Sequence, residues 1–240
     1  MKIQDATILI TGANRGIGLA FAQAVLARGA RRVYAAARDP SSVELSGVTP
    51  ITLDVTRPDQ VAAAAKACSD VTLLINNAGI ARFGGFLADK AVESLQAQLD
   101  VNLFGPLRMV RAFAPVLAAN GGGALLNVLS IASWINRPLL GTYGVSKSAA
   151  WALTNGVRIE LAAQKTQVLG MHMGFVDTDL TTGVDAPKTR PEDVVRIALD
   201  ALEAGALEVL ADEFTRQVHS GLSADPAVYL RNDDTRSVSP

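Results

Sequence analysis

The sequence contains little cysteine and little histidine, with one Cys and two His among 240 residues. A single cysteine excludes an internal disulfide. Cys68 stands in an alanine-rich stretch, which favours a small buried side chain over a reactive thiol. Because zinc sites are built mainly from thiolates and imidazoles, we expect no metal centre.

Excess charge and long apolar runs are also missing. The 22 Lys and Arg against 23 Asp and Glu give a net charge of −1, so we expect neither nucleic acid nor a membrane as partner. No apolar run approaches the length that spans a bilayer, and Lys2 and Asp5 interrupt any signal-peptide core. These absences predict a cytoplasmic protein. Its length favours one domain over residues 1–230, followed by a polar, flexible tail over 231–240.

What the sequence does contain is a regular alternation of short β-branched runs with longer alanine- and leucine-rich segments. Most of the short runs are apolar on both faces, as strands of a sheet covered on both sides must be. The alternation predicts an α/β fold: a doubly wound parallel sheet of about seven strands, with helices on both faces. We expect strands at 6–10, 32–37, 49–53, 71–75, 124–129, 167–173 and 207–210, and helices near 16–28, 58–68, 91–118, 142–164 and 191–204.

Two features of the connections stand out. Only about ten residues separate the second and third strands, which leaves room for little more than one helical turn. The three glycines of "NGGGALL" (120–126) precede a strand, so they indicate a helix stop and a turn.

The stretch "TGANRGIG" (11–18) follows the first strand and opens the first helix. In that position Gly12, Gly16 and Gly18 let the turn tighten and let backbone N–H groups approach an anion at the helix N-terminus. The spacing is G-x-x-x-G-x-G and not the commoner G-x-G-x-x-G. Taken alone, the stretch leaves open a glycine-rich turn without a ligand.

Four further features bear on that choice. "NNAG" (76–79) directly follows the fourth strand, Ser130 ends the fifth, and Asn102 lies inside a long helix. "YGVSK" (143–147) puts a Tyr and a Lys four residues apart near a helix start. In this order and spacing, the motifs resemble the short-chain dehydrogenase/reductase family from residue 5 to about 200.

The resemblance implies a Rossmann-type sheet, a nicotinamide cofactor and a catalytic set of Asn102, Ser130, Tyr143 and Lys147. The chemistry of these residue types agrees with that assignment. A free tyrosine, with a pKa of about 10, holds its proton too tightly to exchange it readily. Because Lys147 shares a helix face with Tyr143, we expect its ammonium group to lower the phenol's pKa. Ser130 can donate a hydrogen bond to a carbonyl oxygen as charge develops there, and Asn102 is implied to support a proton-relay water.

The end of the second strand bears on the choice of cofactor. Ala37 stands where NAD-specific sites usually have an acidic residue, Arg38 follows it, and Arg15 precedes the second glycine of the loop. Two guanidinium groups can bind a 2′-phosphate, so we expect NADP(H). The alternative is that both arginines are solvated. The resemblance implies further cofactor contacts from Gly12, Gly16, Ile17, Gly18, Asp54, Val55, Asn77, Ala78, Gly79, Tyr143, Lys147, Val176 and Thr178.

The sequence departs from the family after the sixth strand. Met173 stands where the family has proline, although Gly174 and Thr178 remain. We interpret His172 as a strand-end residue and not as a catalytic base. The segment that would cover the substrate is short, which favours an open pocket for an apolar ketone or aldehyde. Its expected walls are Phe83, Ser133, Trp134, Leu139, Leu140 and Phe175.

The remaining expectations concern assembly and function. Helices 91–118 and 142–164, which pair across a dimer interface in the family, are both present, whereas the C-terminus departs from the tetramer-forming pattern. We predict a homodimer, with a homotetramer as the alternative. The predicted activity is NADPH-dependent reduction of a carbonyl to an alcohol, reversible as alcohol oxidation. The alternatives are a 3-oxoacyl-thioester reductase and a non-catalytic NADP-binding regulatory protein.

Pro106 carries one further hypothesis. Proline has no N–H, so an α-helix would leave the carbonyl of Asn102, four residues earlier, without its usual donor. The resemblance implies that this carbonyl can hold the relay water. A kink with a purely structural role is the equally weighted alternative.

Overall fold

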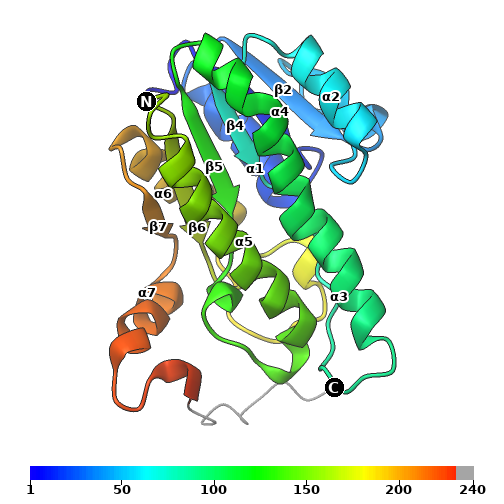
Figure 1. Ribbon diagram of the computed structural model, residues 1–240, viewed down its shortest axis with the longest axis vertical. Coiled ribbons are helices and arrows are strands. Elements are labelled where there is room, and N and C mark those ends of the chain that lie inside the picture. The colour runs from blue at the N-terminus through cyan, green and yellow to red at the C-terminus, as the bar shows by residue number, and fades with distance from the viewer. Residues whose placement is uncertain (231–240) are drawn as a thin grey trace.

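The computed structural model describes residues 1–230, apart from the side chain of Leu139; the expected flexible tail over 231–240 lies outside the described residues. Its centre is a parallel sheet with the strand order β3-β2-β1-β4-β5-β6-β7 (Figure 1). The fold is therefore the Rossmann-type α/β fold that the alternation predicts. The strands are β1 (Thr7–Thr11), β2 (Arg32–Ala37), β3 (Thr49–Thr52), β4 (Leu73–Asn76), β5 (Ala124–Val128), β6 (Gln167–His172) and β7 (Glu208–Leu210).

Helices cover both faces of the sheet. In Figure 1, α4 (Gly105–Ala119) and α5 (Gly141–Glu160) run in front of it. They share their hydrophobic cluster with α2 (Pro58–Ala67), whereas α1 (Gly16–Ala27) and α6 (Pro191–Glu203) share the cluster on the opposite face. No helix within residues 1–230 combines the length and the apolar character needed to cross a bilayer.

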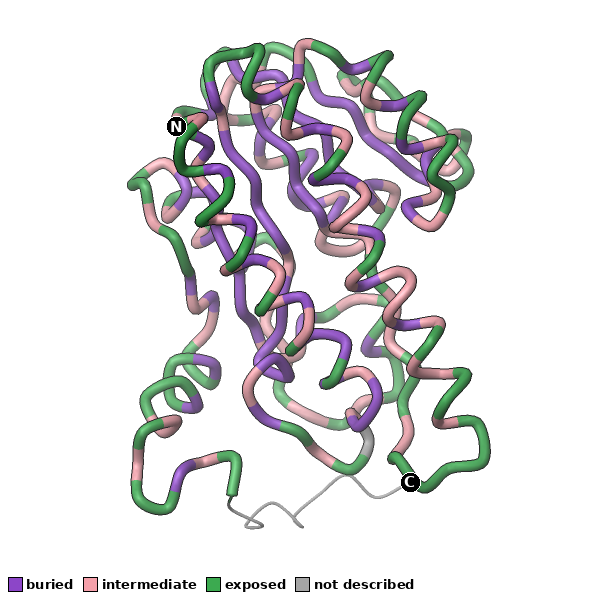
Figure 2. The backbone as a smooth tube through the Cα atoms, viewed as in Figure 1, coloured by how far each residue is buried: buried purple, intermediate pink, exposed green. Residues whose placement is uncertain are grey.

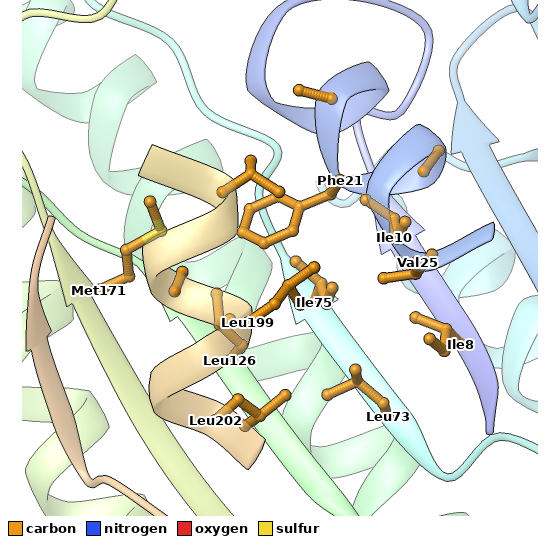
Figure 3. Packing of buried hydrophobic residues seen from close by; sticks show 14 of the residues in the cluster. Ile8, Ile10, Phe21, Val25, Leu73, Ile75, Leu126, Met171, Leu199 and Leu202 are labelled. Atoms are coloured by element: carbon orange, nitrogen blue, oxygen red, sulfur yellow. The ribbon is translucent and has the colours of Figure 1, made fainter. Parts of the chain in front are cut away.

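Alternation along the strands explains why one sheet serves two cores. Ile8 and Ile10 of β1 pack with α1 and α6, whereas Leu9 between them packs against the other face. Figure 3 shows the α1/α6 core, in which Phe21 and Leu199 meet over the strands. The five inner strands are correspondingly buried along most of their length, whereas the edge strands β3 and β7 are largely not (Figure 2).

The strand order reverses beside β1. From β1 the chain builds outward to β2 and β3, then crosses back to place β4 on the other side of β1. In open α/β sheets, ligands bind at the carboxyl ends of the strands where this reversal occurs. The short crossover from β2 to β3 is a single 3₁₀ turn, Pro40–Ser42, as its length predicts.

The expected helix 91–118 is divided in the structure. The α-helix α3 (Ala91–Leu99) leads into a π-helical turn, Asp100–Phe104, and then into α4. Within this turn, the N–H of Gly105 bonds to the carbonyl of Asp100, five residues earlier. The four-residue ladder assumed for Pro106 is therefore wrong here. With five-residue spacing, Pro106 deprives the carbonyl of Val101 of a donor, and with four-residue spacing it deprives the carbonyl of Asn102.

One further helix, α7 (Glu213–Ser220), is not among the helices predicted from the sequence. The signal was present, because the Asp212 carboxylate caps this helix by accepting from Thr215 N at 2.7 Å. In Figure 1, α7 and the segment after it lie beyond the carboxyl ends of the strands. The C-terminal segment therefore borders the functional end of the sheet.

Candidate active site

The glycine-rich loop between β1 and α1 is a backbone-built cradle. Gly12 and Gly16 have φ values of 64° and 54°, which disfavour any residue with a Cβ. A Cβ on Gly18 would overlap the Gly12 carbonyl oxygen and lie 2.6 Å from Asn77 Nδ2. The first turn of α1 has no side-chain cap, so its N–H groups remain available to an anion. The loop therefore fits a phosphate-bearing cofactor.

Two residues join the ends of β1 and β4 beneath this loop. The Thr11 hydroxyl oxygen accepts hydrogen bonds from the N–H groups of Asn77 and Ala78, each at 3.0 Å. The Asn77 amide donates to the carbonyls of Thr11 and Gly12, at 2.9 and 3.1 Å. The "NNAG" motif thus holds the glycine loop against the point where the strand order reverses.

The residues after β2 leave a guanidinium group exposed beside the cradle. Arg38 is exposed and follows the buried Ala37. The Asp39 carboxylate accepts from Ser41 N at 2.9 Å and from Ser41 Oγ at 2.7 Å, so it is bound within its own turn. Burial acts to raise the pKa of Asp54, but the hydrogen bonds from Thr56 and the nearby charges of Arg38 and Arg57 lower it below its usual value. The segment after β2 therefore presents the positive charge of Arg38, while the nearby carboxylate of Asp39 is already hydrogen-bonded to Ser41.

Arg15 has a protein partner that the sequence does not indicate. Its guanidinium group lies 2.8 Å from the carboxylate of Asp179, and both side chains are largely exposed. The Cβ that Gly16 lacks would lie 3.3 Å from Thr178 Cγ2. The glycine loop and the segment after β6 therefore meet across the carboxyl edge of the sheet, and Val176 and Thr178 belong to this second segment.

Ser130, Tyr143 and Lys147 lie together at the carboxyl end of β5. The Ser130 hydroxyl lies near enough to the Tyr143 phenol to act on its pKa. Lys147, one helical turn after Tyr143, has its Nζ 5.8 Å from the centre of the tyrosine ring and donates to the Val128 carbonyl at 2.9 Å. Ser130 Oγ also accepts from Ala132 N at 3.1 Å, which orients the hydroxyl.

Burial has the largest effect on the pKa values of Tyr143 and Lys147. It raises the pKa of Tyr143 to about 12, although Ser130 acts in the opposite direction. It also lowers the pKa of Lys147 to about 8. The groups that act on the tyrosine pKa here are burial and Ser130, so the expected effect of Lys147 stays a prediction. At neutral pH the site holds a protonated tyrosine and a lysine that can release its proton.

Asn102 lies in the π-helical turn, and its side chain is fully engaged. Its Nδ2 donates to Ile80 O and to Ser146 Oγ, and its Oδ1 accepts from Ile80 N, each at 2.9 Å. A Cβ on Gly79 would lie 3.3 Å from Asn102 Oδ1 and 3.8 Å from Lys147 Nζ. Asn102 therefore holds the segment after β4 close to Lys147.

Arg108 stabilises the π-helical turn that carries Asn102. Its guanidinium group donates to the Asp100 carbonyl at 3.2 Å, to the Asp100 carboxylate at 2.7 Å and to the Val55 carbonyl at 3.3 Å. The sequence analysis missed Arg108, because the pairing with Val55 depends on how α4 packs against the segment after β3. Nothing in the local pattern marks it.

His172 is the last residue of β6, as the sequence predicts, but it is not an isolated core residue. Its ring bridges the Ser130 carbonyl and the Glu208 carboxylate, with both distances at 3.0 Å. Trp134 stacks on the ring, with the two ring centres 3.9 Å apart. The sequence analysis missed Glu208, because only the parallel register of β6 and β7 brings it beside His172.

The walls of the expected substrate pocket come from three segments. Ser133 Oγ and Trp134 Nε1 are buried and, within residues 1–230, have no hydrogen-bond partner. Phe83 is exposed, and Phe214 of α7 lies near Gly174 at the end of β6. Nearby, a hollow of about 430 Å³ is lined mainly by apolar surface from residues 85–88, 136–138 and 141. The side chain of Leu139 lies outside the described residues.

The C-terminal segment is attached to this side of the molecule. The Asp212 carboxylate accepts from Gly174 N at 2.7 Å, which joins the start of α7 to the end of β6. Val218 of α7 packs with Ile131 and Ile135 from the segment after β5. The start and the core-facing side of α7 therefore pack against the segments that follow β6 and β5.

The strand order, the glycine cradle and the residues at the end of β5 together define a Rossmann-type oxidoreductase. The chain belongs to the short-chain dehydrogenase family: the family model "short chain dehydrogenase" matches residues 6–189. A short-chain dehydrogenase, srdE, from Neurospora crassa is 34% identical over 93% of this chain and 76% of its own. Another, ptmH, from Penicillium ochrochloron is 38% identical over 73% of this chain and 68% of its own.

A solved structure gives the same result in three dimensions. A short chain dehydrogenase from Burkholderia cenocepacia, in complex with NADP, is 40% identical to this chain. The two superpose with a TM-score of 0.91 over 94% of this chain and 96% of the other. The chain is therefore an oxidoreductase of this family in fold and sequence.

Proposed function

We propose that this protein reduces an apolar ketone or aldehyde to an alcohol with NADPH, and catalyses the reverse oxidation. The observation that carries the proposal is the placement of Ser130 and Lys147 beside the Tyr143 ring at the carboxyl end of β5. A carbonyl oxygen bound there meets two hydroxyl donors and a nearby cation. When bound, the cofactor supplies the hydride.

Each residue has a distinct role in the proposed reaction. Ser130 donates a hydrogen bond to the carbonyl oxygen as negative charge develops on it. Tyr143 then transfers its phenolic proton to that oxygen, and its raised pKa keeps the proton in place until the oxygen becomes more basic. Lys147, with a pKa of about 8, supplies positive charge and can restore the proton near neutral pH. Asn102 holds the segment after β4 beside Lys147.

The preference for NADPH rests on charge at the adenosine end. Arg38 is exposed next to the cradle, and Asp39 is bound to Ser41 and so does not compete for a ribose hydroxyl. A 2′-phosphate would meet Arg38 and, in exchange for Asp179, Arg15. The NADP complex of the Burkholderia relative supports the same preference. Asp54, Val55, Asn77, Ala78 and Gly79 would contact the adenosine and ribose.

The substrate class rests on the pocket walls. They are mostly apolar, and the free polar atoms of Ser133 and Trp134 could each orient one polar group of the substrate. We further propose that residues 1–230 form one domain and that two copies pair through α4 and α5. Phe104, Val145 and Ile159 are exposed on this side of the molecule, which supports the pairing.

The test is NADPH oxidation across aryl ketones, keto esters, steroids and acyl thioesters, with Tyr143→Phe as the key variant. We expect turnover of apolar carbonyls and, in the variant, a loss in kcat of about 100-fold or more, with NADPH affinity nearly unchanged. A variant that kept more than about a tenth of kcat would exclude Tyr143 as the proton donor. Preferential turnover of acyl thioesters would instead favour a 3-oxoacyl-thioester reductase. A chain that binds NADPH but reduces none of these would be a regulatory protein on this fold.

A further inference from the structure

The ring of His172 is completely buried and has no part in the proposed proton transfer. Its Nδ1 lies 3.0 Å from the main-chain carbonyl oxygen of Ser130. Its Nε2 lies 3.0 Å from Oε1 of Glu208 on the neighbouring strand, β7. The ring therefore connects the partly exposed edge of the sheet to the backbone of the residue that would bind the substrate oxygen.

The two partners restrict the protonation of this ring. A main-chain carbonyl only accepts hydrogen bonds, so Nδ1 must carry a hydrogen. Glu208 also accepts from Trp151 Nε1 at 3.2 Å, and the hydrogen bond with His172 lowers the pKa of Glu208, so this group is a carboxylate. Nε2 must then donate as well. The contacts are all satisfied when His172 is an imidazolium paired with a carboxylate.

The Ser130 carbonyl is held from two directions. It accepts from Ser133 N at 3.0 Å, within the 3₁₀ turn Ile131–Ser133, and from His172 across the sheet. The first bond belongs to the turn and moves with it. The second ties the Ser130 carbonyl itself to β6, while Ile131 N, the next residue of the turn, donates to the carbonyl of Met173 just after β6 at 2.8 Å. His172 therefore contributes to the direction of the Ser130 hydroxyl relative to Tyr143 by holding the carbonyl of the same residue.

Trp134 adds a second contact between the ring and the same turn. The two ring planes are inclined by 19°, and the indole covers the imidazole. His219 of α7 lies on Trp134, with ring centres 5.0 Å apart, and its charge contributes to the lowered pKa of Glu208. Glu208 and His219 are thus the titratable groups that reach this ring, from β7 and α7. The lysine of the site, Lys147, is directed to the Val128 carbonyl instead.

We propose that His172, held by Glu208, is a positioning residue that sets the orientation of Ser130 for the reaction through the Ser130 carbonyl. This inference rests on the proposed function, because it assumes that Ser130 binds the substrate oxygen. His172 does not touch the substrate and transfers no proton. Its effect is on kcat, and cofactor binding at the distant glycine cradle does not depend on it.

Two amide variants separate the two hydrogen bonds of the ring. The amide nitrogen of Asn is as many bonds from Cβ as Nδ1 is, so His172→Asn keeps a donor toward the Ser130 carbonyl. The longer Gln places its amide where Nε2 lies, so His172→Gln keeps the bond to Glu208 and loses the one to Ser130. We expect His172→Gln to lower kcat by about tenfold or more and His172→Asn by no more than about threefold. KM for NADPH stays unchanged in both, and melting temperatures identify any variant that is poorly folded.

Proton NMR of the wild-type protein provides a readout that does not depend on activity. A buried imidazolium shows two slowly exchanging ring N–H signals, and with two histidines in the chain a His219→Gln variant assigns them. A single ring N–H signal from His172 would overturn the proposed pairing. Equal kcat in folded His172→Gln and His172→Asn would overturn the positioning role. Ser130→Ala tests the proposed function separately. If this variant keeps wild-type kcat, the proposed function fails. If Ser130→Ala lowers kcat but His172→Gln does not, only the positioning role of His172 is refuted.

Discussion

The part of the site at the N-terminal half of the sheet is formed mainly by main-chain groups, whereas the part at the C-terminal half depends on side chains. In the N-terminal half, β1 to β4, Gly12 and Gly16 take positive φ values, and Gly18 allows the loop to close on Asn77. In the C-terminal half, β5 to β7 with α7, side chains connect neighbouring strands, as the His172 ring of β6 connects the Ser130 carbonyl after β5 to the Glu208 carboxylate of β7. A site formed by main-chain groups can be predicted from one short stretch of sequence. A site made of side chains on different strands depends on the register between them.

The sharpest contrast between the halves concerns glycine. Gly18→Ala should destabilise the protein by about 3 kcal/mol, because the added methyl overlaps the Gly12 carbonyl and Asn77. It should also weaken NADPH binding, since the cradle opens. Gly174→Ala, in the C-terminal half, meets Asp212 and Phe214 only at 3.6 Å and should cost less than about 1 kcal/mol. Urea unfolding of both variants measures the difference, and equal costs would remove the distinction.

Lys147 extends the comparison to buried charge. Lys147→Met should remove turnover yet raise the free energy of unfolding by about 2 kcal/mol at pH 7, because the folded state no longer buries an ammonium. The folded pKa of about 8 lies below the usual value of 10.5, so wild-type stability rises between these pH values. The advantage of the variant should therefore be full below pH 8 and shrink toward pH 10.5.

Unfolding curves at pH 7 and pH 10 measure this effect. Lys66→Met, an exposed lysine on α2, is the matched control and should change stability by less than about 0.5 kcal/mol at either pH. An advantage for Lys147→Met that grew with pH would contradict the lowered lysine pKa.

A third variant tests whether Arg38 contacts the 2′-phosphate of NADPH beside the glycine cradle. Arg38→Asp should cost about 2 kcal/mol in kcat/KM for NADPH relative to NADH, or roughly 30-fold, because it replaces a phosphate partner with a repulsive charge. Arg196→Asp makes the same charge change on α6 and should leave the ratio unaltered. An unchanged ratio in Arg38→Asp would mean that Arg38 stays in solvent.

The smallest expected effect concerns the π-helical turn between the halves. If Pro106 keeps a carbonyl free for a relay water, Pro106→Ala should lower kcat a few-fold and enlarge the solvent isotope effect. Stability should be unchanged or higher, since proline is unfavourable within helices. Wild-type kcat and isotope effect in a folded variant would leave the turn with a structural role alone.

The expected element boundaries differ from the observed strands by at most two residues at either end. Apolar runs, glycines and the lengths of the connections suffice for this, because each strand is buried by whichever helices cover it. The π-helical turn was not predicted, since it needs one extra residue in a helix that otherwise reads as continuous. Arg108 donating to Asp100 and Val55 stabilises that turn, and a helical pattern carries no sign of it.

The sequence alone determined the sheet, the glycine cradle and the residues that converge at the end of β5. Each depends on a local pattern: φ values that only glycine tolerates readily, hydrophobic periodicity, or the four-residue spacing of Tyr143 and Lys147. Only the tertiary structure decided the pairing of Arg15 with Asp179, the protonation of Tyr143 and the bridge from Glu208 through His172 to Ser130. Hydrogen bonds across strands and the removal of water depend on which side chains the fold brings together, and a local pattern carries neither.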